Sequence, residues 1–206
     1  MAETKVKSGR VRASFAHVFQ PKAIEEGGEE KYSITALIPK KTKEGKAMIK
    51  AIEAAIEAAK EKGKSEKFGG KIPKNLKITL RDCDEEVESG DRDFRPEEEG
   101  MMALGMSSKK KPQVVDKDMN LLFSEDDFYS GCYFRFTANF YAYNVNGSKG
   151  IACGLNNIQK VADGERLSGG ASADQDFDDD FDDFEDGEEE DEAPKKPGKK
   201  ASKFLD

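Results

Sequence analysis

The stretch from Cys132 to Asn144, CYFRFTANFYAYN, alternates strictly between two kinds of residue. Its even positions, from Cys132 to Ala142, are all apolar, and its odd positions, from Tyr133 to Tyr143, all carry a polar group. Because successive side chains of a strand point to opposite faces, the stretch predicts a strand with one face in a core. The opposite face, with three tyrosines and an arginine, is predicted to face solvent.

Several other segments have the composition of strands, and two turn signals join them. The segments are residues 10–22, 31–39, 74–82, 101–108 and 150–161. Gly27-Gly28 gives the chain access to positive φ between the first two segments. Asn146-Gly147 is a strong hairpin signal directly after the aromatic segment. These turns predict two antiparallel hairpins.

Residues 42–64 predict the one prominent helix. Apolar residues recur at helical spacing from Met48 to Ala59, with lysines and glutamates between them. Thr42 is a suitable N-cap and Gly63 a suitable stop. Residues 82–101 are polar and acidic, and we expect them to form a long loop.

Short strands, tight turns and one helix predict a mainly β fold, either an antiparallel barrel or a sandwich. No apolar run approaches the roughly 20 residues of a membrane helix, and the N-terminus lacks a signal peptide's apolar core. The three cysteines lack CxxC spacing and fit reduced thiols, so we expect a cytoplasmic protein. A single histidine and scattered cysteines argue against a metal site, and no cofactor is expected.

The net charge of −8 averages over unlike parts of the chain. Residues 174–192 hold fourteen acids and no base, and residues 193–206 hold five lysines and one acid. Removing both from the 42 acids and 34 bases of the whole chain leaves 27 acids and 29 bases in residues 1–173. The body is therefore slightly basic, and such asymmetry is typical of an interaction tail.

The acidic block is too charged and too poor in apolar residues to pack a core. We therefore expect a folded domain in residues 1–170 and a disordered acidic tail with a basic end in residues 171–206. Phenylalanines among carboxylates favour a segment that docks on partner proteins or competes for a basic groove of the protein itself. The alternative is an inert solubilising tail. The candidate partner-binding residues are Phe177, Phe181, Phe184 and Phe204.

The polar face of residues 132–144 carries residue types that bind nucleic acids. Tyrosine rings can stack on any base, for roughly 1–3 kcal/mol each, and arginine can stack or bind phosphate. Arginines of the first strand and the lysine run after residue 108 add further phosphate contacts. Half-buried strand tyrosines and a solvated lysine run are the ordinary alternative. The candidate nucleic-acid-binding residues are Tyr133, Arg135, Tyr141, Tyr143, Arg10, Arg12, Lys109, Lys110 and Lys111.

Enzymatic patterns are weak. Asp82 and Asp84, with the acids after them, could hold Mg²⁺ as in a nuclease, but a hydrated acidic loop explains them as well. Residues 69–71 lack the frame of a phosphate-binding loop. His17 lies in the same strand register as Val11 and Phe15, where we expect a core histidine. No catalytic residue is assigned.

Four stretches of the sequence resemble a family of tailed-phage single-stranded DNA-binding proteins, first catalogued as a domain of unknown function. They are GRVRASFAHVFQPKA, KYSITALIPK, GMSSKKKPQVVD and FYSGCYFRFTANFYAYNVNGSKGIACGLNNIQKVADGERL. The resemblance covers residues 8–170 and is most specific from Phe128 to Leu167. It implies an oligonucleotide/oligosaccharide-binding (OB) barrel that coats single strands in phage replication, recombination and repair. It also implies that the acidic tail recruits replication or recombination proteins.

Two features depart from the family pattern. An OB barrel places its helix between the third and fourth strands, whereas residues 42–64 follow the second strand counted here. Either a strand has gone unnoticed or the barrel carries an inserted helix. The acidic block is also not terminal, because a lysine-rich end follows it. Phe204 would then stand where such tails carry a terminal aromatic.

The sequence leaves several functions open. The first is single-stranded DNA binding, with a homodimer as a possible assembly and no membrane partner. The second is a protein-interaction module that acts through the tail, and an RNA-binding OB protein is a further alternative because stacking alone does not distinguish the sugars. A metal-dependent nuclease ranks last.

Overall fold

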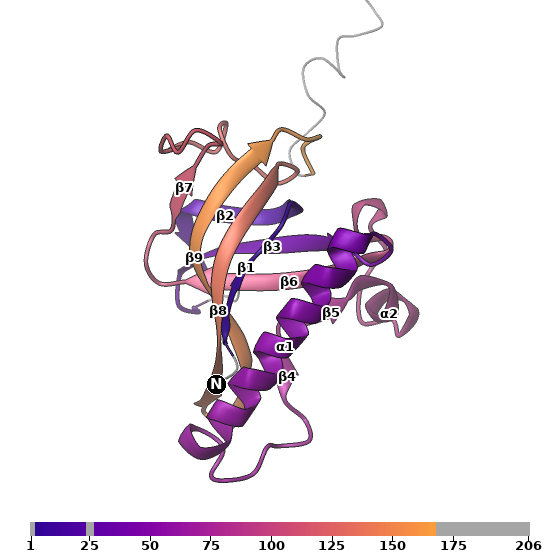
Figure 1. The fold of residues 1–206 in the computed structure, drawn as a ribbon, viewed down its shortest axis with the longest axis vertical. Helices are drawn as coiled ribbons and strands as arrows, with labels where there is room; N and C mark the ends of the chain where they lie inside the picture. The colour runs from indigo at the N-terminus through magenta and orange to yellow at the C-terminus, as the bar shows by residue number, and fades with distance from the viewer. Residues whose placement is uncertain (1–2, 24–26, 168–206) are drawn as a thin grey trace, which may run out of the picture. The chain divides into compact units, whose positions relative to one another are not determined.

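The computed structural model describes residues 3–23 and 27–167, and Figure 1 shows the arrangement of their elements. The strands are β1 (Lys5–Lys7), β2 (Val11–Lys22), β3 (Lys31–Pro39), β4 (Lys77–Ile78), β5 (Leu80–Asp82), β6 (Met101–Ser108), β7 (Gln113–Val115), β8 (Tyr133–Val145) and β9 (Ser148–Ala162). The helices are α1 (Lys43–Glu66), α2 (Cys83–Glu88) and the 3₁₀ helix η1 (Pro96–Glu98).

Five strands form a closed ring. β2 pairs with β3, β3 with β6, β6 with β9, β9 with β8, and β8 with β2. The β6–β9 pair is parallel and the other four are antiparallel. This order matches an OB barrel, in which the third and fifth strands are parallel neighbours. The mainly β, OB-like prediction is confirmed, and closure removes the unpaired edges that an open sheet would expose.

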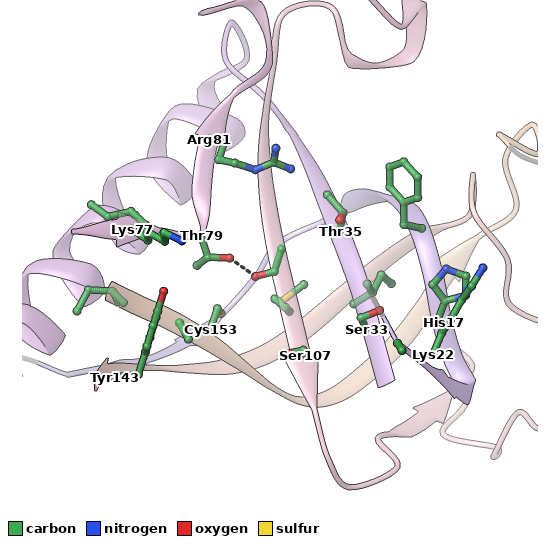
Figure 2. Close-up of a pocket in the computed structure, with 18 residues that line it drawn as sticks. His17, Lys22, Ser33, Thr35, Lys77, Thr79, Arg81, Ser107, Tyr143 and Cys153 are labelled. Carbon is green, nitrogen blue, oxygen red and sulfur yellow. Dashed lines mark hydrogen bonds between the residues drawn. The ribbon is translucent and has the colours of Figure 1, made fainter. Parts of the chain in front are cut away.

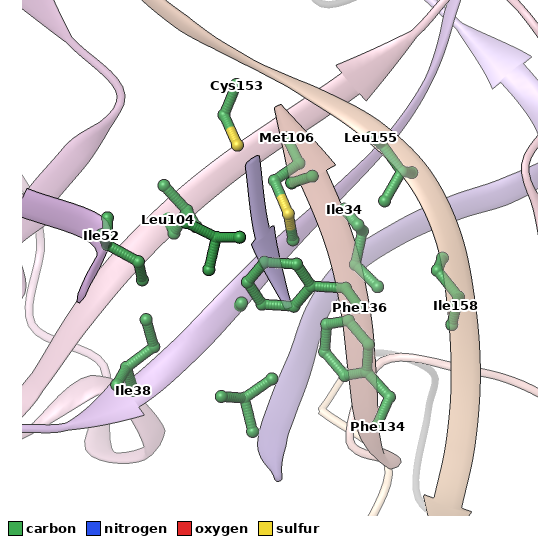
Figure 3. Packing of buried hydrophobic residues seen from close by; sticks show 14 of the residues in the cluster. Ile34, Ile38, Ile52, Leu104, Met106, Phe134, Phe136, Cys153, Leu155 and Ile158 are labelled. Carbon is green, nitrogen blue, oxygen red and sulfur yellow. The ribbon is translucent and has the colours of Figure 1, made fainter. Parts of the chain in front are cut away.

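The interior of the barrel is built on the alternation of β8. Phe134, Phe136 and Phe140 are at most 2% exposed. Phe134 meets Phe128 edge to face, with ring centroids 5.7 Å apart. Figure 3 shows the rings of Phe134 and Phe136 among aliphatic side chains of β3, β6 and β9. The predicted core face of residues 132–144 is therefore confirmed.

Helix α1 follows the expected pattern at its start but extends beyond its expected end. The Thr42 hydroxyl accepts a hydrogen bond from the backbone N–H of Gly45 at 3.0 Å, and the apolar stripe joins the core. Gly63 does not stop the helix, which continues to Glu66. A Cβ on Gly63 would lie 2.2 Å from the Cβ of Ala142, so this glycine serves close packing of α1 on β8.

The helix is an insertion between the second and third strands of the barrel. β3 precedes α1, and β6, the third strand of the ring, follows it. The departure from the usual OB order is thus an inserted helix. The expected strand in residues 74–82 divides into β4, which pairs with β9, and β5, which pairs with β6. The short N-terminal strand β1 was not expected.

Two local predictions are wrong. Residues 82–101 are not a plain loop, because they contain α2 and η1, and Asp82 caps α2 by accepting from two backbone N–H groups. Phe15 and His17 are not on the core side of β2. The register of the β2–β3 pair shifts between Ser14 and His17. Odd-numbered residues face the core before the shift, but after it the even-numbered Val18 is buried.

No helix among the described residues is long and apolar enough to cross a membrane. The boundary expected near residue 170 and the whole expected tail, including Phe177, Phe181, Phe184 and Phe204, lie outside the described residues.

Candidate nucleic-acid interface

A groove of about 570 Å³ lies across the outer side of the barrel. It is lined by residues of β2, β3, β6 and β9 and reaches β4, β5 and the end of β8, as Figure 2 shows. Outward positions of the strands supply small polar groups, such as Ser33 and Thr35 of β3. The labelled lining residues are His17, Lys22, Ser33, Thr35, Lys77, Thr79, Arg81, Ser107, Tyr143 and Cys153.

The strands of the barrel carry a net positive charge because they lack acids. No strand of the ring contains an aspartate or a glutamate, and the same holds for β1. Lys22, Lys77 and Arg81 line the groove. The acids of the described residues lie instead on the helices, on the loops and, as Asp82, at the end of the short strand β5. This separation gives the groove a local positive potential that suits a polyanion, although the body is nearly neutral.

Tyr141 and Tyr143 extend from β8 across glycines of β9. Tyr143 pairs with Gly150, where an added Cβ would lie 2.7 Å from the phenol oxygen. A Cβ on Gly154 would lie 3.3 Å from a ring carbon of Tyr141. The rings therefore rest over backbone that has no side chains. Tyr141 is 46% exposed, and burial of the rest raises the pKa of its phenol, which stays neutral.

Phe15 is an exposed aromatic residue that sequence reasoning missed. It lines the groove, is 42% exposed and adopts a φ of 48°, which is rare for any residue other than glycine. The guanidinium carbon of Arg95 lies 4.9 Å from the centre of its ring. The break in β2 puts Phe15 outside. The sequence signals this break only through the adjacent apolar residues Val18 and Phe19, because neighbouring side chains of a regular strand point to opposite faces.

His17 lies in the groove and not in the core. Desolvation and then the charge of Lys22 lower the pKa of this imidazole, while Glu125 acts in the opposite direction. The ring is therefore neutral in the free protein near neutral pH. A negatively charged ligand in the groove would favour the protonated form of this imidazole.

The predicted lysine run begins directly after β6. Lys109 forms an ion pair with Glu29, and its charge partly offsets the rise that burial causes in the pKa of the Tyr141 phenol. The ammonium of Lys111 lies 5.9 Å from the ring centre of Phe19, and Lys110 is exposed. A binding site shared by Lys109 and Tyr141 stays a prediction.

The other predicted residues lie near the opposite end of β8. Arg10 stacks on Tyr133, with its guanidinium carbon 4.0 Å from the ring centre. Arg12 donates to the backbone oxygen of Glu165 at 3.1 Å, and Arg135 lies 3.5 Å from the backbone oxygen of Ser8. The nine candidates therefore form two groups, one beside the groove and one at the start of β8.

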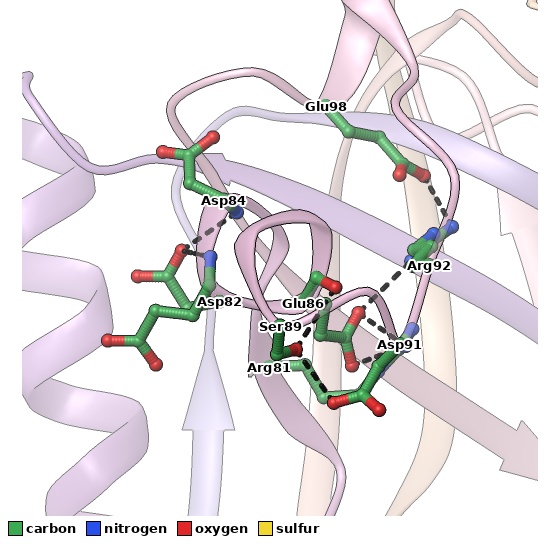
Figure 4. A network of polar contacts seen from close by, with 9 residues as sticks. Arg81, Asp82, Asp84, Glu86, Ser89, Asp91, Arg92 and Glu98 are labelled. Carbon is green, nitrogen blue, oxygen red and sulfur yellow. Dashed lines mark hydrogen bonds and ion pairs between the residues drawn. The ribbon is translucent and has the colours of Figure 1, made fainter.

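Asp82 and Asp84, the two acids named as candidates to hold Mg²⁺, are engaged in ion pairs. The ammonium of Lys40 lies 2.5 Å from a carboxylate oxygen of Asp82 and 2.7 Å from one of Asp84. Figure 4 shows how the neighbouring acids of the same segment pair with arginines. Within residues 3–23 and 27–167, no group of three potential metal ligands comes together.

Known proteins with similar sequences and structures come from bacteriophages. The chain is 32% identical over 186 residues to the protein p50 of Acyrthosiphon pisum secondary endosymbiont phage 1, covering 85% of this chain and 93% of p50. The single-stranded DNA-binding protein of bacteriophage Enc34, solved in complex with single-stranded DNA, is 29% identical with a TM-score of 0.66. That match covers 80% of this chain and 90% of the Enc34 chain.

A more distant structure shares the fold. The single-stranded DNA-binding protein gp2.5 of bacteriophage T7 is 15% identical with a TM-score of 0.56, covering 88% of this chain and 97% of gp2.5. The family model of the Enterobacter phage Enc34 ssDNA-binding protein matches residues 4–192. The match includes the whole barrel and the whole acidic block, and the chain therefore belongs to the Enc34 family of phage single-stranded DNA-binding proteins.

Proposed function

We propose that the protein binds single-stranded DNA through the groove, without sequence preference, in phage replication, recombination and repair. The observation that carries this proposal is the set of exposed aromatic faces beside cations on an acid-free barrel. Tyr141 and Phe15 are exposed, and the half-buried Tyr143 lines the groove with Phe15. The relative from bacteriophage Enc34, whose structure contains single-stranded DNA, supports the same class of ligand.

Stacking explains why the binding would tolerate any sequence. Every base has a π face, and each stacked base contributes roughly 1–3 kcal/mol. Lys22, Lys77, Arg81 and the run Lys109–Lys111 would contact phosphates. Phosphate contacts carry no sequence information and make the affinity fall with salt.

The same mechanism favours single strands over duplexes. The bases of a duplex are stacked on each other, so their faces are not available to tyrosines. Binding of an oligo-dT and of a duplex of the same length tests this point, by fluorescence anisotropy over a range of salt concentrations. We expect much tighter binding to the single strand and a linear fall of log K with log salt. Equal affinity for both, or none for either, would contradict the proposal.

Two alternative functions have direct tests. Oligo-rU in place of oligo-dT tests whether the protein binds RNA equally well. An interaction module that works through Phe177, Phe181 and Phe184 would lack DNA binding in both the full chain and a chain ending at Gly170. We propose binding without catalysis. Mg²⁺-dependent degradation of the oligonucleotide would contradict this part of the proposal. We expect the protein to act in the host cytoplasm, where its three buried thiols would stay reduced.

The tail has a separate proposed role. Its acids and phenylalanines would recruit replication or recombination proteins, and its negative charge would compete with DNA for the groove. Self-association into a homodimer is a further possibility that sedimentation can measure.

A further inference from the structure

We infer that β1 and the outward face of β8 form a second contact for the same nucleic-acid strand after it leaves the groove. We name this surface the β8 strip. Its members are Lys5, Lys7, Arg10, Tyr133, Arg135, Thr137 and Asn139. The inference rests on the proposed function, because it lengthens the path of the same ligand.

The strip is continuous with the groove. Tyr143, Tyr141, Asn139 and Thr137 are successive outward positions of β8, because the intervening side chains face the core or α1. From Tyr143 to Tyr133 the strand advances ten residues, or about 33 Å. A strand of DNA that passes the exposed ring of Tyr141 therefore meets the polar part of β8 without crossing another element of the sheet.

Strand β1 adds two lysines along this path. Lys5 pairs with Asn139 and Lys7 pairs with Thr137, so each ammonium arises beside an outward position of β8. Both lysines are exposed, while Val6 between them is 7% exposed and joins the core. The buried valine fixes the strand and directs the lysines outward.

The charge of the strip is positive and not compensated by nearby acids. Residues 4–24 and 128–162 contain no aspartate or glutamate. Among the described residues, no carboxylate forms an ion pair with Lys5, Lys7 or Arg10. Glu165, close to the far end of the strip, is held by Arg12. The cations therefore remain available to phosphates.

The far end of the strip also has a stacking surface. The guanidinium carbon of Arg10 lies over the ring of Tyr133, 4.0 Å from the ring centre. A guanidinium plane can support a base and bind a phosphate at the same time. The pairing of Arg10 with Tyr133 therefore repeats, at the end of the path, the aromatic and cationic chemistry of the groove.

An ordinary function of edge lysines is to prevent edge-to-edge aggregation, and an experiment on ligand length separates the two roles. Lys5, Lys7 and Arg10 are changed together to alanine. The matched control changes three exposed lysines of α1, Lys46, Lys50 and Lys62, to alanine. Affinity is measured for a short oligo-dT of about 6 nucleotides and a long one of about 16, the range of site sizes known for one OB fold.

We expect the triple variant to lose roughly tenfold in affinity for the long oligonucleotide at moderate salt, with a salt slope smaller by about 2. Its affinity for the short oligonucleotide should match that of the wild type, and the α1 control should resemble the wild type at both lengths. Arg10→Lys keeps the positive charge but removes the planar guanidinium group. A partial loss of affinity for the long oligonucleotide in this variant would show that Arg10 stacks on a base.

The inference is overturned if the triple variant loses affinity equally for the short and the long oligonucleotide, or if its affinities match those of the α1 control. Failure of the wild type to bind the short oligonucleotide would instead contradict the groove itself. Circular dichroism of each variant establishes that the barrel is intact before binding is compared.

Discussion

Single side chains decide whether the barrel face can hold bases, and Tyr141 is the clearest case. It occupies an outward position of β8 and lies over Gly154, so one face of its ring rests on backbone. With 46% of the residue exposed, the other face is open to solvent. Tyr141 therefore contributes little to the core and is well placed for stacking.

We expect Tyr141→Ala to weaken binding of oligo-dT by roughly 1–3 kcal/mol, with little change in thermal stability. Tyr141→Phe keeps the ring and should bind nearly as tightly as the wild type. Anisotropy titrations and thermal unfolding measure the two effects. Unfolding of the alanine variant would mean that this face is part of the core.

Phe15 combines exposure with backbone strain. A φ of 48° costs a residue with a Cβ about 1–2 kcal/mol, and the N–H of Ala16, next in the chain, is satisfied by the hydroxyl of Ser130. Phe15→Gly should therefore be more stable than Phe15→Ala by about 1 kcal/mol. Both variants should lose affinity for oligo-dT. An unchanged affinity of the glycine variant, measured beside its unfolding curve, would remove Phe15 from the site.

His17 predicts a pH dependence of binding. Because its pKa is lowered, the unfolded state takes up a proton first, and stability is lost as the pH falls below about 6.5. A bound phosphate favours the charged imidazole, so binding is linked to proton uptake. Affinity for oligo-dT should therefore rise from pH 7.5 to pH 5.5 by more in the wild type than in His17→Gln. If the affinities of the wild type and of His17→Gln change equally with pH, protonation of His17 is not the cause of the pH dependence.

At the scale of elements, α2 and η1 are held by ion pairs on one side of the barrel. Arg92 donates to Glu98 at 2.7 Å and reaches Glu86 at 3.5 Å (Figure 4), and the side chain of Glu98 is only 4% exposed. Arg81, which lines the groove, also pairs with Glu86 at 2.9 Å. The acidic segment is thus linked to β5 through the ion pair between Glu86 and Arg81.

Arg92→Ala leaves the buried carboxylate of Glu98 without its partner, and we expect a loss of about 3 kcal/mol in the free energy of unfolding at neutral pH. Burial raises the pKa of Glu98. A raised pKa means that the folded state binds the proton more tightly, so this variant should recover stability as the pH falls. The double variant Arg92→Ala/Glu98→Gln should recover it at neutral pH. Denaturant unfolding at two pH values tests both statements.

At the scale of the whole molecule, charge is divided between an acid-free barrel and an acidic C-terminal block. A chain that ends at Gly170 loses fourteen acids of this block. We expect its affinity for oligo-dT to equal or exceed that of the full chain, because a competing polyanion is gone, and the difference should shrink as salt screens it.

A full-length variant with Phe177, Phe181 and Phe184 changed to alanine is the control for this truncation, since it removes the aromatic rings and keeps the charge. Loss of DNA binding in the truncated chain would show that residues beyond Gly170 hold the ligand and would reverse the assigned roles.

Much of the architecture was accessible from local patterns. The alternation of residues 132–144, the helical spacing from Met48 to Ala59 and the Asn146-Gly147 turn each describe contacts between near neighbours in sequence, and all three are confirmed. The break in β2 was not accessible in this way, since it depends on Ser130, which lies 114 positions from Ala16. The predicted DNA-binding residues remain predictions, although the structure shows how they divide into two groups.

The sequence by itself determined the faces of the strands, the helix and the separation of charge, because these depend on side-chain periodicity and composition. Only the tertiary structure decided that the ring closes through parallel β6 and β9, that Phe15 and His17 face the groove, and that β1 places lysines beside β8. Each of these outcomes depends on hydrogen bonds between segments far apart in the chain, whose partners no local pattern specifies.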